Sequence, residues 1–209
     1  MGIRGLLAAI SAGLIFSAAV VCYGEEPPAN RFSNAAAGFS IEKPPSWRFL
    51  SSETIKRNRD RVRLGDEETD KKIKEKAEAP LVVMVKHDDG YESLNTSAQV
   101  IMVPLGAVSG KGAKELLTML LDKYEDVFYE FSILSGVMDS TVDGMTAAVA
   151  EAAYSVFTND GRSYKTFMRI YLVPRGSSAF VISFMGPQTG TDTFNEDFFG
   201  IIESVKIKR

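Results

Sequence analysis

The residues that could carry chemistry in this sequence are few and scattered. Glu151 lies in the middle of the small, apolar run AAVAEAAY. A carboxylate buried there without a partner would be costly, so such a group is either paired or functional. Arg169 on a neighbouring strand could be the cross-strand partner that neutralises Glu151. We expect a structural pair or a semi-exposed position, and we keep Glu151 as a candidate site residue.

His87 is the only histidine of the 209-residue chain, and Asp88 and Asp89 follow it. A His–Asp pair can bind a metal ion or act as a general base. A zinc site needs more ligands, and the rest of the chain offers no second histidine and a single cysteine, Cys22. The sequence therefore predicts no catalytic residue, no cofactor and no metal site. His87 and Asp88 stay beside Glu151 as polar candidates.

The first 24 residues have the composition of a secretory signal peptide. Arg4 precedes a continuous apolar stretch over residues 6–21, and small residues follow it. We expect cleavage after Gly24 and export to the periplasm or beyond the cell. Two alternatives stay open. The stretch could be an uncleaved amino-terminal anchor, although it is slightly shorter than the roughly 20 residues of a spanning helix. Cys22 could instead carry the lipid of a lipoprotein.

Residues 25–37 predict a flexible lead-in, because prolines, asparagine and small residues follow one another without periodicity. A single domain is expected over residues 38–209, a length that suits one substantial core. Residues 53–78 carry many charges of both signs and predict a solvent-facing loop with a short helix near 68–78.

The stretch GFSIEKPPSWRFL predicts the first strand of the domain. Phe39 and Ile41 alternate with polar residues and share one face. Pro44 and Pro45 must end the strand, because proline lacks the N–H of a strand ladder. We expect the only tryptophan, Trp47, to fold back onto an end of the sheet and to be buried there.

Alternating apolar runs dominate the second half of the chain. Asp143-Gly144, Asn159-Asp160-Gly161 and Pro174-Arg175-Gly176 separate these runs as tight turns, so consecutive strands are expected to be antiparallel. Two β-rich runs, residues 81–87 and 97–105, precede them. Within residues 165–173 apolar side chains occupy both strand faces, which predicts that both sides of the sheet are covered.

Two amphipathic helices are expected to supply those covers. The first spans residues 113–128, and the second lies in the closing segment of the chain. Their apolar faces consist of Leu117, Leu120, Leu121, Tyr124 and Phe128 in the first helix, and of Phe194, Phe198, Ile201, Ile202 and Val205 in the second.

The order of these features resembles the PsbP-like family. GFSIEKPPSWRFL is similar to the entry strand of that family, and SSAFVISFMG followed by FFGIIESVKI is similar to its closing strand and helix. The central GKGAKELLTMLLDKY helix and the Asp-Gly hairpins stand in the expected order, so the resemblance covers about residues 38–207. It implies an α+β fold, an α/β/α sandwich whose central antiparallel sheet has helices on both faces.

The resemblance also bears on function. The family includes extrinsic photosystem II subunits, a Ran-binding nuclear import factor and many exported bacterial proteins, which bind other proteins rather than catalyse reactions. We therefore expect a non-enzymatic accessory or adaptor protein of the bacterial cell envelope with a protein partner. A periplasmic protein or lipoprotein that binds a small ligand or metal is the alternative. The net charge of −3 argues against nucleic-acid binding. Membrane association is expected only through an uncleaved signal or a lipid on Cys22.

Overall fold

The structure is a computed structural model that describes residues 30–60, 62–63, 79–88, 93–159, 161–189 and 192–208. The expected signal peptide, Cys22 and the expected helix near 68–78 lie outside these residues. Within them the protein is a mixed α+β fold with two antiparallel sheets, where the sequence predicted one.

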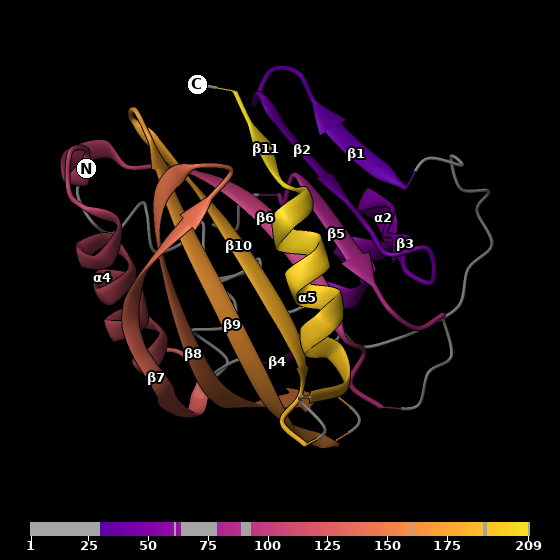
Figure 1. Ribbon diagram of the computed structural model, residues 1–209. Helices are drawn as coiled ribbons and strands as arrows, with labels where there is room; N and C mark the ends of the chain where they lie inside the picture. Colours follow the sequence, from indigo (N-terminus) through magenta and orange to yellow (C-terminus); the bar gives the residue numbers. More distant parts are fainter. Residues whose placement is uncertain are drawn as a thin grey trace.

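The larger sheet runs through the middle of the molecule (Figure 1). Its strands follow the order β3-β5-β6-β10-β9-β8, and both β4 and β7 pair with β8. Every pairing in it is antiparallel. Its described strands are β3 (Arg48–Phe49), β4 (Val62–Arg63), β5 (Val82–Val85), β6 (Ser97–Pro104), β7 (Tyr129–Val142), β8 (Met145–Thr158), β9 (Ser163–Arg175) and β10 (Ser178–Pro187).

The hairpins between β7 and β10 confirm the expected antiparallel order. Val142 pairs with Met145, so Asp143 and Gly144 form a two-residue turn with φ angles of 49° and 71°. Two positive φ angles give a turn whose twist matches that of the flanking strands. The expected turn at Pro174-Arg175-Gly176 begins later than predicted, because Pro174 and Arg175 still pair with β10.

The smaller sheet has the order β1-β2-β11, formed by β1 (Arg31–Asn34), β2 (Phe39–Glu42) and β11 (Lys206–Ile207). β1 corrects the sequence prediction, which placed these residues in a flexible lead-in. Phe32 is partly buried against the core, and Asn34 accepts a hydrogen bond from the Ala37 N–H through Oδ1 (2.9 Å), which closes the turn into β2. Four residues are too few to show a period in the sequence.

The turn of the β7–β8 hairpin also holds the smaller sheet. Asp143 accepts hydrogen bonds from the backbone N–H of Ile207 (2.9 Å) and from Lys206 Nζ (3.1 Å). A side chain at the tip of one hairpin thereby fixes the position of β11, which pairs with β2 on its other side.

Three α-helices are described: α2 (Ser52–Arg59), α4 (Ala113–Glu125) and α5 (Asp192–Ser204), together with the short 3₁₀-helix η1 (Gly106–Val108). α2 corrects the loop expected at its position. Ser51 caps it by accepting the Thr54 N–H (3.2 Å), a local signal that outweighs the many charges of the segment. The expected helix at 113–128 is confirmed as α4, although Phe128 is buried beyond its end. None of the described helices has the length and apolarity that crossing a membrane requires.

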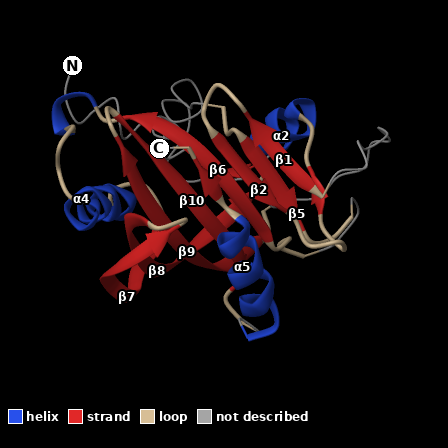
Figure 2. Cartoon of the chain, turned by 45° about the horizontal axis from the view of Figure 1, so that its top comes forward, coloured by secondary structure: helices blue, strands red, loops and turns tan. Residues whose placement is uncertain are grey.

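The core divides into two clusters, one on each side of the larger sheet. α4 packs on one side, and α5, Trp47 and the inner face of the smaller sheet pack on the other. In Figure 2, α4 and α5 lie apart, with strands of the larger sheet between them. On β9 the alternation is as predicted: Met168, Ile170 and Leu172 join the first cluster, and Phe167, Tyr171 and Val173 join the second.

Trp47 is 2% exposed, which confirms the expected burial. Its ring contacts Phe198 edge-on, and its indole Nε1–H donates to Asp197 Oδ2 (3.3 Å). The same oxygen accepts a hydrogen bond from Lys86 Nζ (2.8 Å). One carboxylate of α5 therefore joins the segment after β2 to the end of β5.

We expect Asp197→Ala to lower the free energy of unfolding by about 1–3 kcal/mol, because it leaves a buried indole N–H and a partly buried ammonium without their acceptor. Urea unfolding followed by Trp47 fluorescence measures this. Asp126→Ala is the control, since Asp126 pairs with the neighbouring Lys123 at the surface; its effect should stay within about 0.5 kcal/mol. Equal stability of the two variants would contradict the role given to Asp197.

Candidate functional site

Glu151 on β8 and Arg169 on β9 are direct cross-strand partners, as the sequence predicted. Arg169 Nε and Nη2 both donate to Glu151 Oε1, at 2.8 Å and 2.7 Å. The side chains are 27% exposed for Glu151 and 12% exposed for Arg169, so the pair is largely shielded from water. The carboxylate is thus neutralised in place, and its partner is held in one orientation.

Aromatic rings fix the guanidinium of Arg169 as well. The guanidinium carbon lies 5.8 Å from the ring centroid of Phe167 and 5.3 Å from that of Phe199, within the range of cation–π attraction. Arg169 Nη1 is buried and has no hydrogen-bond partner among the described residues. The Arg169 guanidinium therefore lies between Phe199 of α5 and Phe167 of β9 and does not extend into water.

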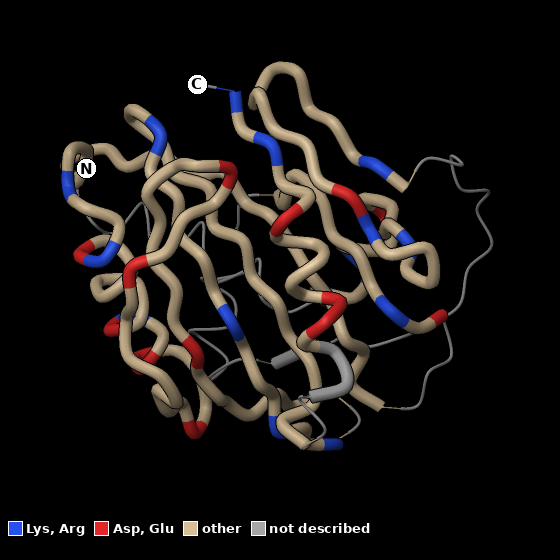
Figure 3. Tube along the Cα trace, viewed as in Figure 1, with Lys and Arg blue, Asp and Glu red and all other residues tan. Residues whose placement is uncertain are grey.

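The pair lies on a face of the larger sheet that α5 covers only in part. Met138 on β7 stands opposite Val149, which shares its face with Glu151, so these side chains point to the same side. Met138 is 51% exposed and Phe199 is 53% exposed. We call this surface the open face and define it by Met138, Val149, Glu151, Arg169 and Phe199. In Figure 3, few charged residues lie along β8, β9 and β10.

The outer edge strand of the sheet also exposes apolar side chains. Among the described residues β7 pairs with β8 alone, and Ile133 and Leu134 on it are 53% and 50% exposed. The register between β7 and β8 shifts three times along the strand. Such irregularities bend an edge strand and limit uncontrolled pairing with other strands. The edge is therefore apolar in side chains but irregular in its backbone.

His87 and Asp88 lie elsewhere. They follow β5, and β6, β10 and β9 separate β5 from β8. The His87 backbone exchanges two hydrogen bonds with the Asn95 amide, at 3.0 Å and 2.8 Å. The Asp88 side chain is 97% exposed and lies 3.6 Å from Arg48 Nε. The structure does not bring the three candidates together. Within the described ranges, no three His, Cys, Asp or Glu side chains gather as metal ligands do.

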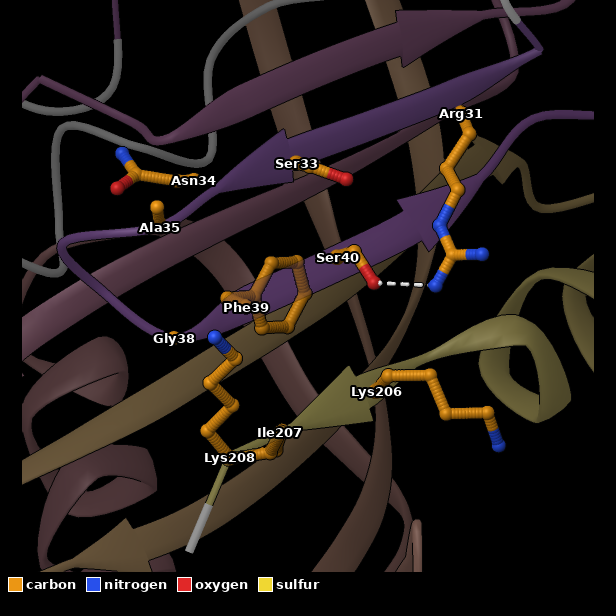
Figure 4. A pocket seen from close by; sticks show the side chains of 10 residues that line it. All are labelled: Arg31, Ser33, Asn34, Ala35, Gly38, Phe39, Ser40, Lys206, Ile207 and Lys208. Carbon is orange, nitrogen blue, oxygen red and sulfur yellow. Dashed lines mark hydrogen bonds between the residues drawn. The ribbon is translucent and has the colours of Figure 1, made fainter.

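A cavity of about 390 Å³ opens on the smaller sheet, at residues that the sequence did not single out (Figure 4). It is lined by Arg31, Ser33, Asn34, Ala35, Gly38, Phe39, Ser40, Lys206, Ile207 and Lys208. The available signal was the alternation of basic and apolar residues in Arg31-Phe32 and in Lys206-Ile207-Lys208. It was missed because the first pair stood in the expected lead-in and the second followed the expected closing helix.

No model of a known protein family matches the sequence, and no curated protein matches it. Solved structures do match the fold. LpqN of Mycobacterium tuberculosis, involved in cell envelope biogenesis, is 15% identical with a TM-score of 0.52, over 88% of this chain and 87% of LpqN. The cyanobacterial PsbP (CyanoP) of Synechocystis sp. PCC 6803 is 12% identical with a TM-score of 0.52, over 90% of this chain and 98% of its own.

The Ran-binding protein Mog1p of Saccharomyces cerevisiae is also similar, at 14% identity and a TM-score of 0.50, over 85% of this chain and 94% of its own. At such identities the similarity shows the fold alone. The protein has the PsbP/Mog1-like fold, which confirms the resemblance inferred from the order of sequence features.

We expect Glu151→Gln and Arg169→Met each to lower the free energy of unfolding by about 1–3 kcal/mol, because each leaves one shielded charge without its partner. The double variant should lose clearly less than the sum, with a coupling of about 1 kcal/mol or more. Chemical unfolding of the four proteins measures the coupling. Strictly additive losses would show that the pair adds nothing beyond its separate side chains.

The pKa of His87 should lie below its ordinary value of 6.5, because partial burial and then the charge of Lys86 disfavour the imidazolium, against the opposing effect of Asp88. The folded state then binds fewer protons than the unfolded state, so His87 lowers stability as the pH falls below about 6.5. A proton NMR titration is unambiguous because the chain has one histidine. A pKa at or above 6.5 would contradict this, and Lys86→Met should move the pKa upward.

Proposed function

We propose that this protein is an exported, non-enzymatic accessory or adaptor protein of the bacterial cell envelope that binds a protein partner through its open face. One observation carries the proposal. Met138 and Phe199, two large apolar side chains, are half exposed on either side of the Glu151–Arg169 pair. Large apolar side chains left exposed near one another are a mark of interaction sites.

The composition of the open face suits a protein interface. Aromatic residues, methionine and arginine are enriched at interface centres, and lysine and glutamate are depleted there. The unbranched Met138 side chain can adapt its shape to an incoming surface. A partner that covers the open face thus gains apolar burial without having to offer a charge.

The ion pair on the open face favours docking for a second reason. Glu151 and Arg169 already satisfy each other in the free protein, so covering them leaves no unpaired charge. Phe167 and Phe199 hold the guanidinium in place before any partner arrives. Side chains ordered in advance lower the entropy that binding must overcome.

The comparisons support the cellular setting of the proposal. LpqN is involved in cell envelope biogenesis and Mog1p binds Ran, so partner binding occurs on this fold. The sequence of the first 24 residues supports export. The packing of α4 on one side of the sheet, and of α5 with the smaller sheet on the other, supports an α/β/α sandwich.

Two features support a non-enzymatic role. Glu151, the strongest candidate acid or base, is neutralised by Arg169 and does not line the described cavity. His87 and Asp88 are remote from it along the sheet. The alternative, a small-ligand-binding protein, has one specific observation in its favour, the cavity on the smaller sheet.

Site-specific photo-crosslinking in the native host tests the proposal. A benzophenone amino acid placed at Met138, and separately at Phe199, should yield the same protein adduct, because both side chains border one surface. The control position is Glu125, which is exposed on α4 on the other side of the sheet. It should not yield that adduct.

A charge placed in the open face sharpens this experiment. With the photoprobe at Met138, Phe199→Asp should remove most of the adduct while circular dichroism shows an intact fold, since burying an unpaired carboxylate opposes docking. Different adducts from Met138 and Phe199, or one adduct shared with Glu125, would overturn the open face as the binding surface.

A further inference from the structure

The outer face of the smaller sheet is polar and basic, whereas its inner face belongs to the core. Phe39 and Ile207 are buried, and Phe32 is partly buried against them. Alternation therefore turns their strand neighbours outward. Ser33 stands opposite Ser40, and Ser40 stands opposite Lys206, so one polar row crosses all three strands.

Cationic side chains stand at the two ends of the cavity on this face. Figure 4 shows the Arg31 guanidinium beside Ser40 at one end, where Nη2 donates to Ser40 Oγ (2.8 Å). At the other end the Lys208 ammonium turns toward Gly38 and Phe39. Lys206 also lines the cavity, but its ammonium points away and donates to Asp143 (3.1 Å).

The charges around the cavity do not cancel. None of its lining residues is acidic. Arg31 has one carboxylate nearby, Glu42 at 3.6 Å, and both side chains are 51% exposed, which makes this a weak pair. Within the part of the chain that the structure describes, Lys208 forms no ion pair.

A further cation stands behind the turn that borders the cavity. Arg175 Nη1 donates to the Ala37 carbonyl. A Cβ added at Gly38 would lie 3.1 Å from Arg175 Nη2 and 3.1 Å from Lys208 Cβ, so both basic side chains crowd this glycine. Gly38 has a φ of 60° and admits no side chain without strain. Positive charge is therefore concentrated here on a chain whose net charge is −3.

We propose that this cavity binds the phosphate group of a small soluble molecule. The guanidinium of Arg31 donates in a planar fork, the ammonium of Lys208 donates as a point charge, and the Ser40 hydroxyl lies between them on the sheet. A phosphate group carries more negative charge at pH 7 than a carboxylate, so a lining without acidic residues favours phosphate over acetate. A volume of about 390 Å³ leaves room for the rest of a small molecule.

Amide NMR tests the site with inorganic phosphate at pH 7.5, with sodium chloride adjusted to hold the ionic strength constant. Saturable shifts should be confined to residues 31–40 and 206–208. Lys208→Met should weaken binding about tenfold or more, a change of about 1.4 kcal/mol. Lys208 is exposed, so this variant should fold normally. Lys123→Met on α4 removes the same charge elsewhere and should leave the affinity unchanged.

Further probes distinguish phosphate from carboxylate ligands, and a soluble phosphate compound from a lipid headgroup. Acetate should bind more weakly than phosphate, and glycerol 3-phosphate at least as tightly. Vesicles of phosphatidylglycerol should not co-sediment with the protein. The assignment is overturned by non-saturable shifts, by equal losses in Lys208→Met and Lys123→Met, by acetate binding as tightly as phosphate, or by binding to vesicles alone. Lys208→Met should leave crosslinking at Met138 intact. The experiment can therefore refute the phosphate site without refuting the open face as a binding surface.

Discussion

The fold depends on one constraint: β9 and β10 are apolar on both faces, so two separate covers must be present at once. Met168 and Ile170 point to one side of β9, and Phe167 and Val173 point to the other. A sheet with one solvent-exposed face would leave half of these apolar side chains in water. α4 supplies the first cover, and α5 with the smaller sheet supplies the second. The termini of the domain are therefore part of its core.

The two covers end at different places on the sheet. α4 packs against β7, β8 and β9, so one side of the outer strands is closed. On the other side α5 leaves part of β8 uncovered, where Val149 and the Glu151–Arg169 pair are only partly buried. A charged pair is tolerated here because each group neutralises the other. The open face is thus a result of how far the second cover extends.

The antiparallel hairpins, the helix that became α4 and the burial of Trp47 were predictable because each has a local cause: a turn pair, an apolar period or a large ring beside proline. The Glu151–Arg169 pair was also within reach, since alternation places both residues on facing strands. β1 was not predictable, because Phe32 is its single inward apolar residue. The strand pairs with β2 only because a turn folds it back. The cavity depends on Arg31 and Lys208, which are remote in sequence. They reach the same face of the smaller sheet because β1 and β11 both pair with β2.

The pairing of β2 with β11 has a consequence for the order in which this chain can fold. Ser40 and Phe39, at the start of the domain, pair with Lys206 and Ile207 at its end. A polypeptide emerges from the ribosome amino end first. β2 therefore cannot pair with β11 until residues 206–207 have left the ribosome. The smaller sheet therefore stays incomplete until residues 206–207 have been synthesised.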